Sequence, residues 1–220
     1  MMALTPVSLD SVAVIGAHCG DIAIGVGATL IEIARDNPDL VVHALVLTGG
    51  GADRELEEKN VFAAICASVD IRLTVADLPY GRLPDHGRKV QQQLAEFRRD
   101  CEPDLVFGPQ RSGCDQDDRL VAGLIPAEFG DHLVLGYDIL KSESDLSNPV
   151  LYLPIPSETA HQKAKLLVEC YPSQSGHGWF DDEAFLGLMR VRGVQCRARY
   201  AEAFTLERAL LDAETDYSVN

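Results

Sequence analysis

His18 and Asp21 are the residues of this chain whose types and spacing most clearly suggest chemistry. They follow an apolar run at 12–16 that is typical of a buried strand, and they precede an apolar, glycine-containing segment at 22–30 with the composition of a helix. Open α/β sheets bind ligands where a strand passes into its helix. An imidazole and a carboxylate on such a turn can bind one metal ion, because zinc accepts both nitrogen and oxygen donors.

A second polar group follows the apolar run at 105–108, and it comprises Asp115, Asp117, Asp118 and Arg119. Two interpretations remain open. Aspartates at a helix N-terminus accept hydrogen bonds from free backbone amides, and such capping would account for Asp117 or Asp118. Carboxylates this close together, beside the His18/Asp21 turn, also repel one another unless a cation or Arg119 compensates their charge, and this favours a metal site.

The elements that must position these residues alternate along the chain. Apolar runs predict strands at 12–16, 41–47, 71–75, 105–108, 133–137 and 150–155, with a last edge strand at 200–206. Helices are expected at 21–35, 52–68, 87–99, 118–128, 157–170 and 181–192. This alternation predicts an α/β fold, with a mostly parallel sheet covered by helices on both faces.

Length and composition favour one domain. A chain of 220 residues with 46% hydrophobic content can bury a core, and we expect a single domain at 1–211 followed by an acidic tail at 212–220. The polar stretch 141–149 is interpreted as a loop between strands, and the helix at 181–192 could contribute to the core or to a homo-oligomer contact.

The net charge of −15 argues against nucleic acid and anionic membranes as partners, because both would repel the chain. The N-terminus lacks the pattern of a secretory signal and no apolar run approaches bilayer length, so we expect a cytoplasmic protein. The six cysteines show no CxxC spacing and are expected to be mostly reduced and buried. Cys19 and Cys114 flank the two polar groups, and either they occupy turn positions or their thiolates point inward as ligands. The glycines at 49–51 do not fit the dinucleotide fingerprint, which argues against a nicotinamide or flavin cofactor.

At these residues the chain resembles the PIG-L/LmbE-like zinc-dependent N-deacetylases, which remove acetyl groups from amino sugars and related amides. That family carries the motif A-H-P-D-D-E, with A-H-C-D-D-I in one branch, and later H-x-D-H followed by Arg. The matching residues here are 17–22 and 115–119. The resemblance extends over most of the chain, through 25–30, Arg54, 104–107, 171–174 and 200–204. It implies a Rossmann-like, three-layer LmbE-like fold.

The resemblance implies a role for each matching residue. The metal ligands would be His18, Asp21 and Asp118, and the substrate-binding residues Arg54 and Arg119. Arg54 is equally well explained as a surface partner for Glu57 or Glu58. The position of the family's general base is occupied by Gly20, which cannot accept a proton, and that of its oxyanion-stabilising histidine by Asp115. Losing a positioned base costs roughly 10²- to 10⁴-fold in rate, and losing an oxyanion donor roughly 10²- to 10³-fold.

Two functions therefore remain open. The first is a metal-dependent amide hydrolase that deacetylates an amino sugar or related small molecule, with Asp115 or Asp117 as the catalytic group that transfers the proton. Its cofactor would be Zn²⁺ or, since two carboxylates and one imidazole favour harder ions, another divalent metal. The second is a family member that has lost hydrolysis, binds no metal or binds it weakly, and binds a sugar, a nucleotide sugar or a protein partner or performs different chemistry.

Overall fold

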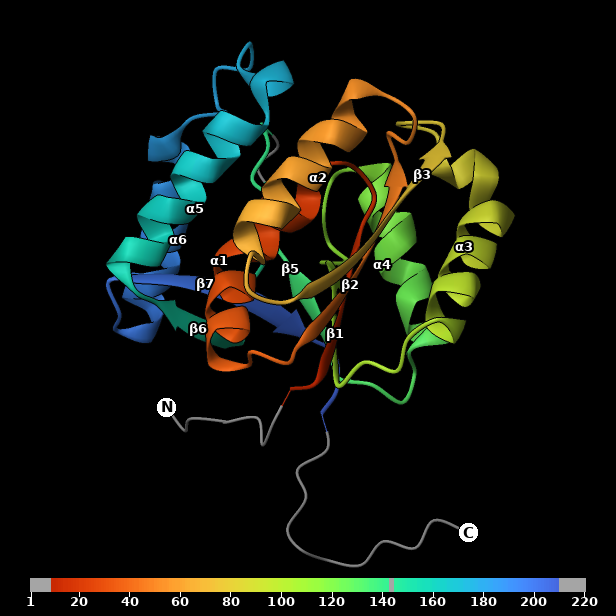
Figure 1. Ribbon diagram of the computed structural model, residues 1–220, viewed down its shortest axis with the longest axis horizontal. Coiled ribbons are helices and arrows are strands. Elements are labelled where there is room, and N and C mark those ends of the chain that lie inside the picture. The colour runs from red at the N-terminus through yellow and green to blue at the C-terminus, as the bar shows by residue number, and fades with distance from the viewer. Residues whose placement is uncertain (1–8, 143–144, 210–220) are drawn as a thin grey trace, which may run out of the picture.

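The computed structural model of the protein describes residues 9–142 and 145–209. Within these ranges seven strands form one sheet in the order β3-β2-β1-β4-β5-β7-β6 (Figure 1). The strands are β1 Ser11–Gly16, β2 Val41–Thr48, β3 Asp70–Leu78, β4 Leu105–Pro109, β5 Val134–Tyr137, β6 Leu151–Ile155 and β7 Tyr200–Leu206. The α-helices are α1 Asp21–Asp36, α2 Asp53–Ile65, α3 Gly87–Arg99, α4 Gln116–Glu128, α5 Ser157–Cys170 and α6 Asp182–Cys196. Two short 3₁₀ turns lie at Leu83–His86 and Pro172–Gln174.

The predicted α/β architecture is confirmed. Strands β3, β2, β1, β4 and β5 pair in parallel, and β7 is antiparallel to both β5 and β6. The helix and strand boundaries differ from the expected ones by a few residues. Helix α2 ends at Ile65 rather than at 68, because a turn leads into β3. Helix α4 begins at Gln116 rather than at 118, because an upstream aspartate caps it.

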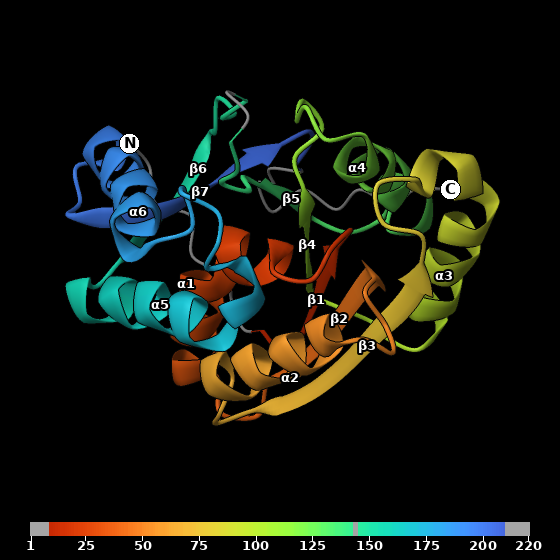
Figure 2. The same ribbon diagram turned by 90° about the horizontal axis from the view of Figure 1, so that it is seen from above.

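Helices cover both faces of the sheet (Figure 2). Helices α1, α2, α5 and α6 lie on one face, where Ile22, Val26 and Leu30 of α1 are buried in the larger apolar core. Helices α3 and α4 lie on the other face and contribute Leu94 and Val121 to a second core. Burial of these faces against a shared sheet fixes where each connecting loop begins and ends.

The order of the strands places a topological switch point between the neighbouring strands β1 and β4. From β1 the chain proceeds to β2 and β3 on one side, whereas β4 and β5 lie on the other side of β1. The loops that leave the carboxyl ends of β1 and β4 therefore diverge, as at the ligand-binding switch points of open α/β sheets. The two polar groups expected to carry chemistry lie on these two loops.

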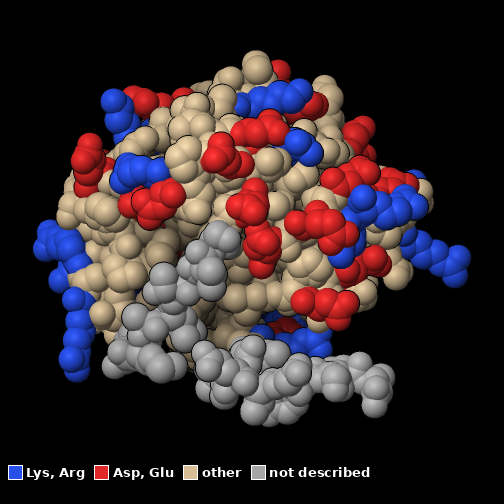
Figure 3. Space-filling model, turned by 60° about the horizontal axis from the view of Figure 1, so that its bottom comes forward, with Lys and Arg blue, Asp and Glu red and all other residues tan. Residues whose placement is uncertain are grey.

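The negative charge is distributed over the surface. On the face shown in Figure 3, acidic side chains are interspersed with basic ones. None of the helices within the described ranges has the length and apolar character needed to span a bilayer. The predicted acidic tail at 212–220, and the domain end at 211, lie outside the described residues.

Candidate metal and substrate site

The turn after β1 is organised by its own side chains. The backbone N–H of His18 donates to Oδ2 of Asp21 at 2.8 Å, which brings the two side chains onto the same side of the turn. Gly20 precedes helix α1 with φ of 102°, a left-handed conformation that glycine adopts at no steric cost. The N–H of Gly20 donates to Oε2 of the buried Glu58 at 2.7 Å. Asp21 thereby enters the first turn of α1 as a buried carboxylate.

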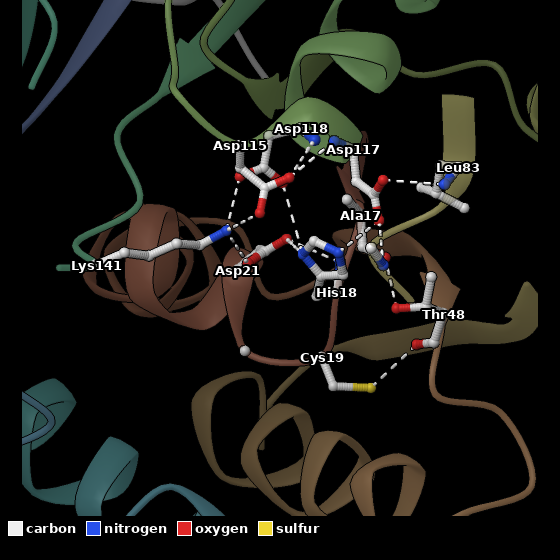
Figure 4. Close-up of polar contacts among 12 residues, drawn as sticks. Ala17, His18, Cys19, Asp21, Thr48, Leu83, Asp115, Asp117, Asp118 and Lys141 are labelled. Atoms are coloured by element: carbon white, nitrogen blue, oxygen red, sulfur yellow. Dashed lines mark hydrogen bonds and ion pairs between the residues drawn. The ribbon is translucent and has the colours of Figure 1, made fainter. Parts of the chain in front are cut away.

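The start of α4 supplies the second group of side chains. Oδ1 of Asp115 accepts from the N–H groups of Asp117 at 2.8 Å and Asp118 at 3.2 Å. The prediction that Asp117 or Asp118 caps this helix is therefore wrong. Asp115 is the cap, because the residue just before the first turn is the one whose carboxylate reaches the free amides two and three residues on. Capping and a cluster of acids thus coexist here, and Asp117 and Asp118 point elsewhere (Figure 4).

The imidazole of His18 is held in one orientation. Its Nε2 lies 3.0 Å from Oδ2 of Asp117, a fully buried residue that also accepts from the N–H groups of Gly81 at 2.7 Å and Leu83 at 2.9 Å. A carboxylate bound to one ring nitrogen fixes the tautomer and directs the other nitrogen at a metal. The other nitrogen, Nδ1, lies 3.4 Å from Oδ2 of Asp21 and 3.7 Å from Oδ1 of Asp118.

These three side chains fit a metal ion. One ligand atom from each of His18, Asp21 and Asp118 lies within 4.8 Å of the others. Nδ1 of His18 and Oδ1 of Asp118 are buried and have no hydrogen-bond partner, which is costly unless a ligand satisfies them. Metal–ligand bonds of about 2.1 Å in a tetrahedral site place the donors roughly 3.4 Å apart. The observed separations of 3.4 and 3.7 Å are close to that value.

A lysine that sequence reasoning missed also enters the cluster. Nζ of Lys141, just beyond β5, lies 2.8 Å from Oδ2 of Asp118, 3.4 Å from Oδ2 of Asp115 and 3.8 Å from Oδ1 of Asp21. The expectation that Arg119 compensates these acids is wrong. Its guanidinium donates to the backbone carbonyls of Gly113 and Cys114, in the loop before α4. The signal that could have found the lysine is its place at the carboxyl end of a predicted parallel strand.

Close packing of charges shifts the pKa values of the site. Burial would lower the pKa of His18, but the carboxylates of Asp21, Asp117 and Asp118 outweigh it and raise that pKa to about 10. Burial and the neighbouring Asp21 raise the pKa of Asp118. Burial opposes ionisation of Asp21, but His18 and Lys141 lower its pKa. The surplus of carboxylates therefore favours one additional positive charge in the site, either a proton or a metal ion.

A cavity of about 570 Å³ opens beside the cluster. His18, Asp21, Asp115 and Lys141 line its inner part, and the aromatic side chains that line it include Tyr80, Tyr171, Trp179 and Phe180. The Tyr80 ring packs against the imidazole of His18 with centroids 4.3 Å apart. The loop residue His177 also lines the cavity. The site therefore has room for a small molecule next to the buried donors.

Arg54 lines the cavity but is also bonded to its surroundings. Its guanidinium donates to Glu57 at 2.8 Å, to Ser173 at 2.9 Å and to the backbone carbonyl of Cys19. The pairing with Glu57 expected from the sequence is thus observed, but Glu57 is buried and the pair is not a surface one. Arg54 also forms part of the cavity wall. The thiol of Cys19 donates to the carbonyl of Thr48, while Cys114 is exposed. Cys19 is therefore engaged in the turn rather than directed at the cluster.

Structure comparisons identify the fold. The sequence matches no protein-family model and no curated protein. Among solved structures, N,N'-diacetylchitobiose deacetylase from Pyrococcus horikoshii superposes with a TM-score of 0.74 at 18% identity, over 96% of this chain and 88% of that one. The zinc-inhibited form of teicoplanin deacetylase gives 0.68 at 17% identity, over 90% and 98% of the two chains. The fold is that of the LmbE-like deacetylases.

The same fold also carries other chemistry. The 4-carboxy-2-hydroxymuconate hydratase from Pseudomonas putida superposes with a TM-score of 0.71 at 16% identity, over 92% of this chain and 99% of that one. At such identities the similarity establishes the fold, and function must be argued from the site.

Proposed function

We propose that this protein is a metal-dependent amide hydrolase that removes the acyl group from an N-acylated amino sugar or a related small molecule. One observation carries the proposal: Nδ1 of His18 and Oδ1 of Asp118 are buried, lie 3.7 Å apart beside Asp21 and have no hydrogen-bond partner among the described residues. The deacetylases that share the fold support it. The substrate is proposed to be uncharged or cationic near the cluster, because carboxylates surround it.

The ion would be held by His18, Asp21 and Asp118. A divalent ion in such a site polarises an acyl carbonyl and makes water a stronger nucleophile. Zn²⁺ is proposed because it accepts both nitrogen and oxygen donors, and the two carboxylates make a harder ion such as Mn²⁺ a compatible alternative. Asp117 keeps the His18 ring in place from behind, through the 3.0 Å contact at Nε2.

Asp115 is proposed to accept the proton of the attacking water, since Gly20 has no side chain to do so. Its Oδ1 caps α4, whereas Oδ2 faces Lys141 and the cavity. Burial would raise the pKa of Asp115, but Lys141 and His18 lower it, so the carboxylate is ionised at neutral pH. A low pKa makes Asp115 a weak base, and we expect a turnover well below that of a site with a base near pKa 7.

The remaining cavity residues would hold the substrate. Tyr80 and Trp179 offer aromatic faces to a sugar ring, and Arg54 offers guanidinium donors to a hydroxyl group. The donors of Arg119 are engaged with backbone carbonyls of the loop before α4. Arg119 is therefore proposed to act on the substrate indirectly, by holding this loop in place. The six cysteines, all within the described ranges, are free thiols, and we propose the reducing cytoplasm as the working compartment.

The test combines metal content with hydrolysis. The purified protein is titrated with Zn²⁺, analysed for bound metal at saturation and assayed in the presence of Zn²⁺ on a panel of N-acetylated amino sugars, with Asp118→Ala as the test variant and the exposed Asp39→Ala as its matched control. Stoichiometric metal and acetate release that are both lost in Asp118→Ala, and kept in Asp39→Ala, support the proposal. Acetate release that persists in Asp118→Ala would contradict it.

The second candidate is a non-hydrolytic member of this fold, and the Gly20 turn favours it. A catalytic carboxylate at position 20 would require a non-glycine residue with φ of 102°, a backbone conformation that such residues rarely adopt. A metal-loaded protein that binds an amino sugar without releasing acetate would support this candidate. Installing Gly20→Asp, Asp115→His and Asp118→His together tests whether the remaining pocket can still deacetylate.

A further inference from the structure

Lys141 divides the oxygens of the acidic cluster into two sets. Its Nζ lies 2.8 Å from Oδ2 of Asp118 and 3.8 Å from Oδ1 of Asp21. The opposite oxygens, Oδ1 of Asp118 and Oδ2 of Asp21, are the ones closest to Nδ1 of His18. Each of these two carboxylates therefore has one oxygen toward the ammonium and one toward the imidazole (Figure 4).

The ammonium of Lys141 lies within the acidic cluster, and most of its side chain is shielded from solvent. The side chain of Lys141 is 20% exposed, and it faces Asp115 as well, at 3.4 Å. Its carboxylate partners at 21 and 118 are 4% and 7% exposed. At these depths the interaction is weakly screened by salt, so the positive charge acts strongly on whatever lies next to the two carboxylates.

The carboxylates of the cluster attract a divalent ion, and the ammonium of Lys141 weakens the binding of that ion. Asp21, Asp115, Asp117 and Asp118 supply four carboxylates. Lys141 contacts Asp21, Asp115 and Asp118, whereas Asp117 contacts the imidazole of His18. Without the ammonium, a divalent ion would meet these acids with no competing cation. With it, the ion must share Asp21 and Asp118 with a fixed positive charge and is repelled by that charge.

We propose that Lys141 is an internal cation that holds Asp21 and Asp118 in place and competes with the metal, so that the site binds a divalent ion weakly and reversibly. The inference rests on the proposed function only in taking His18, Asp21 and Asp118 as the ion's ligands. The lysine orients the outer oxygens of the two acids, and the inner oxygens stay on the side of the imidazole. Its charge, rather than the identity of the ligands alone, sets the affinity.

The experiment measures Zn²⁺ affinity by competition with a chromogenic chelator, using the full chain. Lys141→Met removes the charge and keeps the length of the side chain, Lys141→Arg keeps the charge, and the exposed Lys165→Met is the matched control. We expect Zn²⁺ to bind Lys141→Met roughly ten- to a hundred-fold more tightly than the parent, on the scale of a nearby fixed charge. Lys141→Arg and Lys165→Met should stay within about three-fold of the parent.

Thermal unfolding provides a readout that does not depend on activity. Metal-free Lys141→Met should melt at a lower temperature than the parent, because its acids lose their cation. Added Zn²⁺ should raise its melting temperature by more than it raises the parent's, since tighter binding stabilises the folded state more. Equal or weaker Zn²⁺ binding by Lys141→Met, or tighter binding by Lys141→Arg, would overturn the inference.

The two proposals fail separately. If the parent binds no Zn²⁺ and releases no acetate while Lys141→Met gains Zn²⁺ binding, the inference stands and the proposed hydrolase fails. If the parent hydrolyses its substrate with Zn²⁺ and Lys141→Met binds the ion no better, the hydrolase stands and the inference fails.

Discussion

A buried and a half-buried lysine of this fold, Lys163 and Lys141, have different surroundings. Lys163 of α5 donates to Glu202 of β7 at 2.5 Å and to the backbone carbonyl of Ile24. Glu202 also accepts from the backbone N–H groups of Ala28 at 3.0 Å and Thr29 at 2.7 Å, so one positive and one negative charge face each other with their hydrogen bonds made. Lys141 instead faces three carboxylates, and buried polar atoms beside them have no partner.

The difference between the two lysines distinguishes an ion pair that stabilises the fold from a charged cluster that can bind a ligand. A buried ion pair whose polar atoms are all satisfied has little to offer a ligand, and it fixes how α1, α5 and β7 pack. A cluster with surplus negative charge and unpaired atoms is stable only if something else binds there. The imbalance around Lys141, more than the presence of charged residues, therefore supports the proposal that this end of the sheet is the functional one.

The largest effect is expected where the balanced pair is broken. Lys163→Met leaves the Glu202 carboxylate buried without its cation and should cost about 3–5 kcal/mol of unfolding free energy, measured by urea denaturation. Lys141→Met should cost less than half as much, because Lys141 is 20% exposed whereas Lys163 is 3% exposed, and because the acids around Lys141 can take up a proton or a metal ion instead. Adding Glu202→Gln to Lys163→Met should recover part of the loss. Equal losses for the two lysine variants would remove the distinction drawn here.

Glu58 is a third case, a fully buried carboxylate to which no cation is bonded within the part of the chain that the structure describes. Oε2 accepts from Tyr171 at 2.6 Å and from the N–H of Gly20, and Oε1 is unpaired. Burial raises the pKa of Glu58 from 4.5 to about 7, with Asp21 adding to the rise and Tyr171, Gly20 and Arg54 opposing it.

Because the folded state holds this proton more tightly than the unfolded chain, Glu58 contributes stability below pH 4.5 that is lost as pH rises through about 7. The loss is on the order of 3 kcal/mol. Glu58→Gln keeps an acceptor for both hydrogen bonds and does not titrate. Its stability relative to the parent should therefore increase between pH 4 and pH 8, as measured by denaturant unfolding at each pH. Parallel profiles for the two proteins would show that Glu58 is not the group responsible.

A smaller effect is expected at the residue that orients the imidazole. Asp117→Ala leaves the N–H groups of Gly81 and Leu83 without their acceptor and frees the His18 ring. We expect a loss of about 1–3 kcal/mol in stability and a ten- to hundred-fold loss of Zn²⁺ affinity. Asp117→Asn, which keeps one acceptor, should lose less stability than Asp117→Ala. Unchanged Zn²⁺ binding in Asp117→Ala would mean that the ring needs no support.

The smallest effect is expected at Arg119. Its donors hold the loop carbonyls of Gly113 and Cys114 and do not reach the acids, so Arg119→Ala should cost less than about 1 kcal/mol and leave Zn²⁺ affinity unchanged. Arg54→Ala is the matched comparison. Arg54 lines the cavity, so its replacement should weaken substrate binding. A change in Zn²⁺ affinity in Arg119→Ala would show that the arginine does compensate the cluster.

Much of the fold could be predicted from local patterns. Apolar runs at β1, β2 and β4 and amphipathic segments between them are properties of neighbouring residues, and they determine where strands and helices form. The motif at His18 and Asp21 could be located for the same reason, because the turn after β1 is short. The cap of α4 was assigned to the wrong aspartate, since adjacent acids satisfy the same preference and only the backbone geometry distinguishes them.

The sequence by itself determined the element types, the sheet class and the residues able to bind a metal, because these depend on side-chain chemistry and on spacing within one turn. Only the tertiary structure decided which charges face one another. Lys141 lies 23 residues from Asp118 and far from Asp21 in the chain, and it reaches both through the order of β5, β4 and β1 in the sheet. Electrostatic balance depends on distances in space, and a folded sheet sets those distances by strand order rather than by separation along the chain.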